Sequence, residues 1–385
     1  MKIAILVRIL WSAGTQKFAI EQARALANYG CDVEIIFLRR AKNGDVYDDL
    51  LNGVNYRVLT DKNNSSLASL YDYITGIFME TRKGEGRVDY NLLRRFPNYA
   101  KNKYDLIICQ DQWAGLSGYY TWKRFRIPYI VILHERVNNF PWIRGFKRIL
   151  VRVALYYQRK ILQNAKGVFS LTKKVADNAI SFYSRDDLHV IDNFPGLELR
   201  NFVDYYEKSN TIVLLSYWNE VKVPEMYFDL FKTLENYKFL MLGNWISESY
   251  RDQYVSKIRK MGISDRVILK SGLSEDEKNE LISRSKFCVR FGMGEYGPGI
   301  GSIEALALGV PLIINRELGI ADQIEGYQLG LIVNDVCDVG SVVRFVEEHD
   351  NVESYRDSQN EIRRFVEDHS WNKHCERLLK YVEND

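Results

Sequence analysis

The feature that most constrains the fold is a series of short, continuous apolar runs separated by stretches with helical spacing. In the first forty residues, KIAILV (2–7) and DVEIIFL (32–38) flank a segment whose apolar positions repeat at helical spacing up to Gly30. Runs of this kind are typical of strands buried on both faces of a parallel sheet. The chain therefore begins with a predicted βαβ unit, and the predicted fold class is α/β.

The same alternation of strands and helices continues along the chain and restarts after the segment 193–196, Asn-Phe-Pro-Gly. A chain of 385 residues is long for a single core, which favours two domains. We therefore expect two Rossmann-like, doubly wound domains that face each other across a cleft and divide near residue 200. The further predicted strands are 104–109, 128–133, 167–171, 188–192, 211–216, 238–243, 266–272, 286–292, 311–315 and 329–333, with helices over about 224–236 and after Ser274.

Composition excludes several classes of protein. Hydrophobic residues (46%) and charged residues (27%) are at ordinary globular levels, which rules out a disordered chain or a coiled coil. The five cysteines are scattered and contain no CxxC pair, which suits a reducing cytosol and argues against disulfides and a zinc site. The apolar run at the start ends at Arg8 and indicates a strand, not a secretory signal. No run approaches the ~18 apolar residues of a spanning helix, so we expect a soluble or peripheral protein.

The most informative stretch for function is 292–311, GMGEYGPGIGSIEALALGVP. Glycines at 292, 294, 297, 299 and 301 precede a predicted helix that contains Glu304. A glycine-dense loop that enters a helix permits close backbone approach and offers free N–H groups to an anion. A carboxylate one turn inside that helix can accept hydrogen bonds from ribose hydroxyls. The alternative is a tight strand-to-helix turn with a solvated Glu, although five glycines exceed what such a turn needs.

This stretch resembles the family-4 retaining glycosyltransferases of GT-B fold. Their hallmark is a Glu, seven residues, and a second Glu that opens an alanine-rich helix ending in Gly-Val-Pro. Residues 304–311, EALALGVP, match the second half closely. In the first half a gapless match places Tyr296 where the first Glu belongs, with Glu295 one residue early. Either a one-residue insertion keeps Glu295 in the role, or the sugar-contacting carboxylate is lost.

The resemblance extends over nearly the whole chain. Gly14-Thr15 stands at the family's N-terminal glycine-rich loop, and SLTKKVADN (170–178) and VIDNFPG (190–196) resemble later segments of its first domain. SWNKHCERLLKY (370–381) resembles the last helix, which in this fold crosses back to the first domain. The resemblance implies an acceptor-binding domain over 1–198 with a C-terminal helix over about 370–385. It implies a donor-binding domain over 199–369.

One departure concerns the residues that hold the donor diphosphate. The segment LLSYWNEVKVPE (214–225) resembles a strand end that carries an Arg and, five residues later, a Lys. Lys222 falls on the Lys, but Tyr217 replaces the Arg, which removes a fork-shaped cation from the expected phosphate site. Arg290, just before the glycine loop, is a candidate substitute; otherwise it is a solvated charge at a strand end.

The resemblance also implies roles for individual residues. His134 follows the predicted strand in YIVILHER, and the resemblance implies that it contacts the sugar or acceptor near the anomeric carbon. The alternative is a core or capping histidine. Glu295 holds the transferred sugar, Glu304 holds the ribose, and Lys222 offsets the charge of the leaving diphosphate without a metal. The other four histidines (189, 349, 369 and 374) are expected on the surface. The implied catalytic residues are His134, Glu295 and Lys222, and the implied donor-binding residues are Gly14, Thr15, Lys222, Arg290, Gly297, Gly299, Ile300, Gly301 and Glu304.

Charge is distributed unevenly between the two halves of the chain. Residues 1–200 carry 31 Lys and Arg against 19 Asp and Glu, whereas residues 201–385 carry 22 against 31. Residues 136–176 hold ten Lys or Arg and no acid, and aromatic residues lie among the cations. This pattern predicts a peripheral surface for anionic membrane. Its candidate membrane or acceptor residues are Trp142, Arg144, Lys147, Arg148 and Arg152.

An ordinary helix is the alternative for this basic segment. In that case Ile149, Leu150, Val153 and Leu155 pack into the first domain and the charges form a solvated outer face. No nucleic-acid recognition module accompanies the segment, so we expect no nucleic-acid partner. The acidic stretches 45–49 and 185–187 lack the apolar strand that precedes a metal-binding acidic motif, so we expect no metal and no cofactor.

The combined expectation is a cytoplasmic glycosyltransferase, peripheral at the membrane, that moves a hexose with retention. The donor is a UDP- or GDP-sugar and the acceptor a lipid-linked or other saccharide. Two alternatives stay open. A non-catalytic sugar-nucleotide binding protein is favoured by Tyr217 and by the displaced first Glu. A nucleotide-sugar epimerase of the same fold needs additional acid and base carboxylates.

Overall fold

A computed structural model describes residues 1–11, 13–40, 48–59, 90–137, 144–145, 147–183 and 188–384 of this chain. These residues form two compact units. The first unit combines Met1–Gly196 with Trp371–Asp385, and the second unit is Leu197–Ser370. The chain therefore leaves the first unit, builds the second and returns to complete the first.

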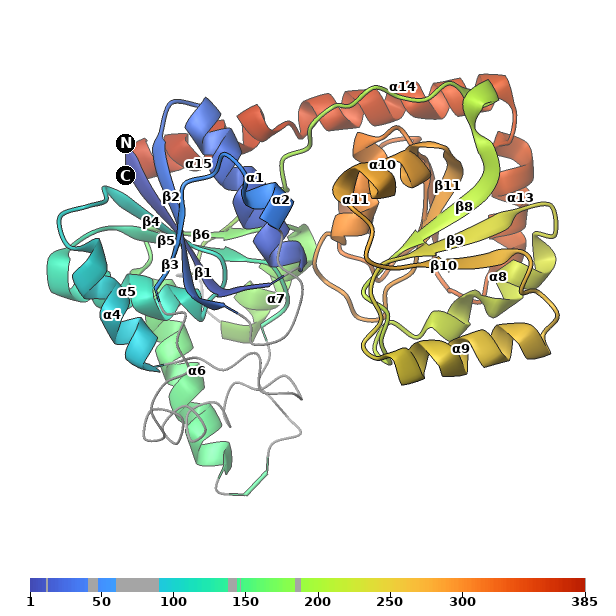
Figure 1. Ribbon diagram of the computed structural model, residues 1–385. Helices are drawn as coiled ribbons and strands as arrows, with labels where there is room; N and C mark the ends of the chain where they lie inside the picture. The colour runs from blue at the N-terminus through green and yellow to red at the C-terminus, as the bar shows by residue number, and fades with distance from the viewer. Residues whose placement is uncertain are drawn as a thin grey trace. The chain divides into compact units, whose positions relative to one another are not determined.

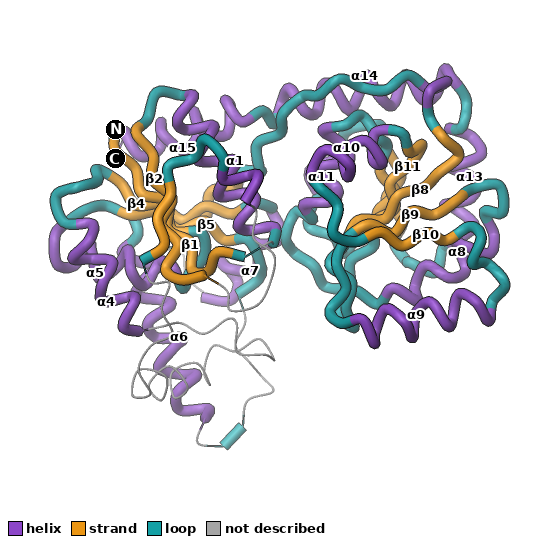
Figure 2. The backbone as a smooth tube through the Cα atoms, in the orientation of Figure 1, coloured by secondary structure: helices purple, strands orange, loops and turns teal. Residues whose placement is uncertain are grey.

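The first unit is built on a seven-stranded parallel sheet with strand order β3-β2-β1-β4-β5-β6-β7. Figure 2 draws the strands in orange among the helices that surround them. The order reverses at β1, which pairs with β2 on one side and with β4 on the other. Its inner strands are almost wholly buried, as expected for continuous apolar runs covered on both faces. The strands are β1 (Lys2–Leu10), β2 (Asp32–Arg40), β3 (Tyr56–Val58), β4 (Leu106–Cys109), β5 (Tyr129–Leu133), β6 (Gly167–Ser170) and β7 (Val190–Asp192).

Helices cover both faces of this sheet (Figure 1). One face packs against α1 and α15, and the shared core includes Phe18 and Leu26 of α1 with Leu378 and Val382 of α15. The other face packs against α5, whose Gly118 lies directly on Cys109 and Tyr129. The helices are α1 (Gly14–Asn28), α2 (Asp48–Leu51), α4 (Tyr90–Ala100), α5 (Ala114–Phe125), α6 (Lys147–Asn164), α7 (Lys173–Tyr183) and α15 (Trp371–Asn384).

The second unit is built on a six-stranded parallel sheet with strand order β10-β9-β8-β11-β12-β13. Here the order reverses at β8, which pairs with β9 and β11. Open α/β sheets bind ligands outside the carboxyl ends of the strands at such a reversal. The strands are β8 (Ser209–Leu215), β9 (Lys238–Leu242), β10 (Val267–Lys270), β11 (Ser285–Arg290), β12 (Leu312–Asn315) and β13 (Gly330–Val333).

The helices of the second unit also lie on both faces of its sheet (Figure 1). Apolar residues of α8, α9 and α13 form one core with the sheet, and α10 and α11 lie on the opposite face. The elements are η1 (Tyr205–Glu207), η2 (Pro224–Tyr227), α8 (Phe228–Thr233), α9 (Glu248–Lys260), α10 (Glu275–Ser283), α11 (Ile300–Ala307), α12 (Ala321–Ile324), α13 (Val339–His349) and α14 (Val352–Asp368).

The predicted strands are found close to their expected positions, and the capping of α10 follows the sequence. The Ser274 side chain accepts from the Glu277 backbone N–H while the Glu277 carboxylate accepts from the Ser274 N–H, which satisfies two donors that the helix start leaves unpaired. The helix expected over about 224–236 is instead a 3₁₀ turn followed by the short α8. Among the described helices, none is both long enough and apolar enough to cross a membrane.

Candidate functional site

The candidate site lies at the carboxyl edge of the second sheet, where the strand order reverses between β8 and β11. The loop after β8 carries Lys222, and β11 ends at Arg290, directly before the glycine loop. Parallel neighbouring strands bring these two loops to the same edge although they are far apart in the sequence. The position is the one at which doubly wound sheets bind their ligands.

Two cations converge on one carboxylate at this edge. Lys222 Nζ lies 2.5 Å from Glu295 Oε2, and Arg290 Nη2 lies 2.7 Å from the same oxygen. The side chains of Arg290 and Glu295 are only 6% and 13% exposed, so the cluster is poorly solvated. With two positive charges and one negative, its formal charge is +1.

Burial and charge oppose each other at Glu295. Burial alone raises the pKa of this carboxyl group, but the charges of Arg290 and then Lys222 outweigh burial and lower the pKa below its ordinary value. Burial also lowers the pKa of the Arg290 guanidinium, and the neighbouring Glu295 more than restores it. Glu295 therefore keeps its negative charge and Arg290 its positive charge at neutral pH.

Two buried oxygen atoms beside this cluster lack a partner. Oε1 of Glu295, the carboxylate oxygen that the cations do not contact, has no hydrogen-bond partner among the described residues. The same holds for Oγ of Ser302, in the first turn of α11. A buried polar atom without a partner costs free energy, on the order of 1–3 kcal/mol. Such atoms at a sheet edge mark where a polar ligand would supply the missing hydrogen bonds.

Glycine is required at two positions that set the course of the loop into α11. Gly299 adopts φ +68°, a left-handed conformation that side-chain-bearing residues rarely adopt. A Cβ on Gly301 would lie 2.6 Å from Cβ of Leu215, so the first turn of α11 packs directly on the end of β8. Gly301, and Ile300 directly before it, are thus held close to the strand end that leads to Lys222, whereas Gly299 lies against Leu318 and the Gly297 carbonyl lies against Gly319.

The structure corrects the expectation that the whole glycine loop offers free N–H groups. The N–H of Gly292 donates to Oδ1 of the buried Asn315 at 2.8 Å, and the N–H of Gly294 donates to Glu317 Oε2 at 2.7 Å. The amide of Asn315 also donates back to the Gly292 carbonyl at 2.8 Å. The first part of the loop is therefore fastened by one side chain at the end of β12 and one just after it, and anion binding falls to the start of α11.

Glu304 lies in a second charged cluster, on α11. Its Oε1 is 2.9 Å from Nζ of Lys278, and the same ammonium group is 2.7 Å from Glu275 Oε1 on α10. Lys278 was not identified from the sequence, because a Lys within an acidic helix carries no signal of its own. Tyr217, which stands where the resemblance expects an Arg, is 41% exposed.

In the first unit, His134 follows β5 at the carboxyl edge of the sheet. Its Nε2 lies 2.9 Å from Oε1 of the buried Gln110, and its ring packs edge-on against Phe18 of α1, with centroids 5.1 Å apart. Gly14 and Thr15 are the first two residues of α1. His374 was expected on the surface, which is wrong. It is 3% exposed, because α15 places it in the core of the first unit.

The predicted basic segment is described only in part. Trp142 lies outside the described residues, as do the side chain of Lys147 and the acidic side chains of 45–49 and 185–187. Arg144 and Arg152 are exposed and Arg148 is half-buried. Of the four apolar residues that the alternative packs into the first domain, Ile149 and Val153 are 52% and 48% exposed, which contradicts it at these two positions; Leu155 is half-buried, and the side chain of Leu150 lies outside the described residues.

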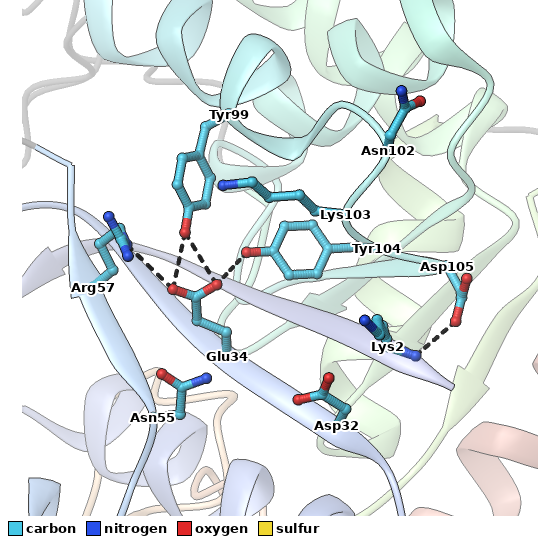
Figure 3. Close-up of a pocket in the computed structure, with 10 residues that line it drawn as sticks. All are labelled: Lys2, Asp32, Glu34, Asn55, Arg57, Tyr99, Asn102, Lys103, Tyr104 and Asp105. Carbon is cyan, nitrogen blue, oxygen red and sulfur yellow. Dashed lines mark hydrogen bonds and ion pairs between the residues drawn. The ribbon is translucent and has the colours of Figure 1, made fainter.

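A pocket of about 660 Å³ occupies the opposite, amino edge of the first sheet (Figure 3). At its centre Glu34 of β2 accepts hydrogen bonds from the hydroxyls of Tyr99 and Tyr104 and contacts Arg57. The pocket coincides with none of the predicted site residues. Within the described ranges, no group of three or more His, Cys, Asp or Glu side chains forms a potential metal site.

Comparison with known proteins relates both units to glycosyltransferases. Residues 12–195 match the family described as Glycosyltransferase Family 4, and residues 197–378 match the family described as Glycosyl transferases group 1. Among curated proteins, no sequence matches the chain significantly. Together the two matched ranges include most of the chain.

Solved structures resemble the chain over its whole length. HepE from Anabaena, crystallised with UDP and glucose, is 15% identical with a TM-score of 0.75, covering 100% of this chain and 99% of that one. Sucrose-phosphate synthase from Thermosynechococcus elongatus is 15% identical with a TM-score of 0.74, covering 100% and 98%. The lipopolysaccharide outer core galactosyltransferase WaaB is 14% identical with a TM-score of 0.66, covering 100% and 99%. At these identities the structures show the fold alone.

The two parallel-sheet units, with α15 returning to the first of them, are the GT-B fold of glycosyltransferases. The two matched families then identify the kind of glycosyltransferase. This chain belongs to the glycosyltransferases, with a first unit that matches Glycosyltransferase Family 4 and a second unit that matches Glycosyl transferases group 1.

Proposed function

We propose that this glycosyltransferase moves a hexose from a UDP- or GDP-sugar to a lipid-linked or other saccharide acceptor, with retention of configuration and without a metal. The observation that carries the proposal is the cluster of Lys222, Arg290 and Glu295 at the strand-order reversal of the second sheet. A poorly solvated cluster with an excess positive charge is suited to a diphosphate, because electrostatic attraction is stronger where water is excluded.

In the proposed reaction, the bond between the anomeric carbon and the diphosphate oxygen breaks and its electron pair stays on the diphosphate. The acceptor oxygen forms the new bond to the anomeric carbon on the face that the diphosphate leaves, and the acceptor's proton passes to the departing diphosphate oxygen. The diphosphate thus gains negative charge as it leaves, and groups already in place to offset that charge lower the barrier. Lys222, Arg290 and the N–H groups at the start of α11 are the groups assigned to this role.

The remaining carboxylates are assigned by their surroundings. Glu295 keeps one oxygen without a protein partner, which suits an acceptor for a hydroxyl of the transferred sugar. Glu304 accepts hydrogen bonds from ribose hydroxyls, with Lys278 fixing its position. UDP and glucose in the HepE structure, and UDP-glucose in a second structure of that protein, support a nucleoside diphosphate sugar as the donor class.

The first experiment is a panel of UDP- and GDP-sugars incubated with the purified full chain, with binding measured by calorimetry and products by mass spectrometry. We expect one donor to be bound and its sugar transferred or slowly hydrolysed. We also expect Glu304→Gln to weaken nucleotide affinity about tenfold, which corresponds to the ~1.4 kcal/mol lost when hydrogen bonds to a charged group are weakened. Glu280→Gln, an exposed carboxylate on α10 paired with Arg284, is the matched control.

The same experiment separates the alternatives. Nucleotide-sugar binding without transfer or hydrolysis would favour a non-catalytic binding protein. Conversion of the donor to its epimer in the absence of acceptor would identify an epimerase. Wild-type nucleotide affinity in Glu304→Gln would show that the glycine-loop assignment is wrong.

We further propose that α6 docks the first unit on anionic lipid at the cytoplasmic face of a membrane. The amino-terminal part of α6 extends away from the sheet (Figure 1). It exposes the apolar side chains of Ile149, Val153 and Tyr156 beside the basic Arg152. An apolar face flanked by basic residues is what an interfacial helix requires.

Vesicle co-sedimentation tests the docking surface. Each basic residue near an anionic surface contributes about 1 kcal/mol, so Arg148→Glu/Arg152→Glu should weaken binding at least about thirtyfold. The binding should also fall at high salt, where the Debye length is about 3 Å. Arg251→Glu/Lys260→Glu, the same charge change on exposed positions of α9, is the control. Equal binding to neutral and anionic vesicles would overturn the proposal.

A further inference from the structure

A continuous line of hydrogen bonds runs from His134 through the interior of the first unit. His134 Nε2 lies 2.9 Å from Gln110 Oε1, and Gln110 Nε2 donates to Gln22 Oε1 at 2.6 Å. Gln22 Nε2 lies 2.9 Å from His374 Nε2, and His374 Nδ1 lies 3.0 Å from the carbonyl oxygen of Phe194. We call these four side chains and this carbonyl the polar relay.

The polar relay joins elements from distant parts of the chain. Gln110 directly follows β4, Gln22 lies on α1, His374 lies on α15, and Phe194 belongs to the segment between β7 and the second unit. Gln22 and Gln110 are fully buried and His374 is 3% exposed. Buried polar groups without partners are costly, so three such side chains in one line indicate a constraint beyond packing.

The direction of every hydrogen bond in the polar relay follows from its far end. A backbone carbonyl only accepts, so His374 carries its proton on Nδ1. In a neutral ring Nε2 then accepts, and Gln22 must present its amide N–H₂ to it and its oxygen to Gln110. Gln110 accordingly donates to Gln22 and turns its own oxygen to His134. That oxygen accepts only from a protonated Nε2.

Both rings are neutral at physiological pH. Burial lowers the pKa of His134 to about 4, against a smaller opposing effect of Asp111. Burial likewise lowers the pKa of His374 to about 4, partly offset by its hydrogen bond to Phe194. With one proton on each ring, the polar relay fixes His134 as the Nε2–H tautomer and leaves the lone pair on Nδ1.

We propose that Gln110, Gln22 and His374 are positioning residues that hold His134 in one neutral tautomer, so that its Nδ1 accepts a hydrogen bond from a hydroxyl of the sugar or acceptor. The second half of this statement rests on the proposed glycosyl transfer, whereas the tautomer itself does not. A ring held in this way has no proton on Nδ1 and presents no positive charge to a reacting centre. It orients a hydroxyl through the acceptor atom alone.

The first test is nitrogen NMR of the full chain with ¹⁵N-labelled histidine and without substrate. The sequence has five histidines, and single His→Gln variants assign the signals. We expect His134 and His374 to carry their protons on opposite nitrogens at neutral pH, Nε2 in the first and Nδ1 in the second. Both rings on the same tautomer, or either ring as an imidazolium, would overturn the polar relay.

A variant at the middle of the polar relay tests whether the hydrogen bonds from His374 determine the tautomer of His134. Gln22→Met is close in shape but removes both hydrogen bonds, so Gln110 is free to turn and the His134 signals should move toward a mixture of tautomers. Gln22→Glu still accepts from Gln110 and should restore the wild-type His134 signals, even though it alters His374. Gln16→Met is the matched control, because Gln16 is another buried glutamine on α1 and bonds to the Ile9 carbonyl. Unchanged His134 signals in folded Gln22→Met would refute transmission through the relay.

Transfer kinetics then test the functional half. We expect kcat of Gln22→Met to fall about tenfold, as happens when the outer partner of a working histidine is removed, with little change in donor KM. Gln22→Glu should recover most of that loss. A shifted tautomer with unchanged transfer would refute the role of His134 toward a hydroxyl while leaving the tautomer assignment in place. Absence of any transfer by wild type would instead refute the proposed function.

Discussion

Two buried carboxylates, Glu34 in the first unit and Glu295 in the second, are satisfied in different ways. Glu34 receives hydrogen bonds from two neutral tyrosine hydroxyls and contacts Arg57, whose side chain is 58% exposed. Glu295 receives two cations on one oxygen, one of them the buried Arg290. The first arrangement is neutral overall and fully partnered, whereas the second has a positive excess and an unpartnered oxygen.

The difference separates Glu34, a carboxylate whose partners are complete within the protein, from Glu295, the carboxylate that we propose binds the donor sugar. The tyrosines at Glu34 complete its hydrogen bonds, so this carboxylate has no unpartnered oxygen to offer to a ligand in the pocket around it. At Glu295 the carboxylate holds Lys222 and Arg290 in place without cancelling both charges. The unpartnered oxygen and the two cations at Glu295 therefore favour the carboxyl edge of the second sheet as the binding site.

The largest effect is expected when one of the two positive charges beside Glu295 is removed. Lys222→Ala should lower kcat/KM, and the loss should correspond to about 2–4 kcal/mol of transition-state stabilisation, because the variant removes one preorganised charge that we place opposite the leaving diphosphate. Steady-state transfer assays measure this loss. Lys232→Ala, an exposed Lys on α8 paired with Asp229, is the control and should retain wild-type kinetics. Activity of Lys222→Ala within about threefold of wild type would remove Lys222 from the mechanism.

Glu295→Gln tests the same cluster by removing its negative charge while both cations stay. The amide keeps the shape, releases both cations from their counter-charge and weakens hydrogen bonding to a sugar hydroxyl. We expect transfer to fall by about 1.5–3 kcal/mol, the range for a hydrogen bond to a charged group, with affinity for the free nucleoside diphosphate retained or increased. Calorimetry alongside kinetics distinguishes the two effects, and a loss of diphosphate affinity would contradict the assignment.

The pH dependence of stability provides an independent check on the same cluster. The pKa of Glu295 is lowered by folding, so its contribution to stability is present above its ordinary value of 4.5 and is lost as pH falls through the folded pKa. Denaturant unfolding of wild type and Glu295→Gln should therefore differ most near neutral pH and converge in acid. A constant difference from pH 7 to pH 3 would mean that the ion pairs contribute little.

The smallest effect is expected at the structural carboxylate. Glu34→Gln keeps one acceptor oxygen for the two tyrosines and loses the charge that faces the exposed Arg57. We expect the free energy of unfolding to fall by about 1 kcal/mol, the ordinary contribution of one hydrogen bond, and transfer kinetics to stay unchanged. Urea unfolding and the transfer assay together measure this. A loss of transfer would show that the pocket at the amino edge takes part in function.

The sequence predicted strands and helix ends correctly wherever neighbouring residues alone formed the pattern. Continuous apolar runs located the inner strands, and Ser274 with Glu277 located the start of α10. Lys222 and Glu295 were named because the resemblance assigns them to the donor site, and Arg290 because it directly precedes the glycine loop. The parallel pairing of β8 and β11 brings the segments that carry them together. The three-residue β3 gave no signal, because Tyr56 and Arg57 are exposed and polar in pattern.

The polar groups that were missed depend on contacts between distant segments. Gln22 and Gln110 carry no motif, and burial of His374 follows only from the return of α15 to the first unit. Lys278 became relevant through α10 packing beside α11, which places its ammonium group on Glu304. Side chains that pair across 26 to 352 positions are invisible to local pattern, because nothing in their neighbourhood reports the partner.

The return of α15 to the first unit also dictates an order of events during synthesis. The strands of the first sheet leave the ribosome early, but Cys375, Leu378, Leu379 and Val382 complete one face of that core only after the whole second unit has been made. Domains generally fold as units while the chain is extended at about 5–20 residues per second, so the first unit waits on the order of ten seconds or more with an apolar face uncovered. The second unit, contiguous in sequence, is under no such delay. We therefore expect the core of the second unit to be complete before that of the first, against the order of the chain.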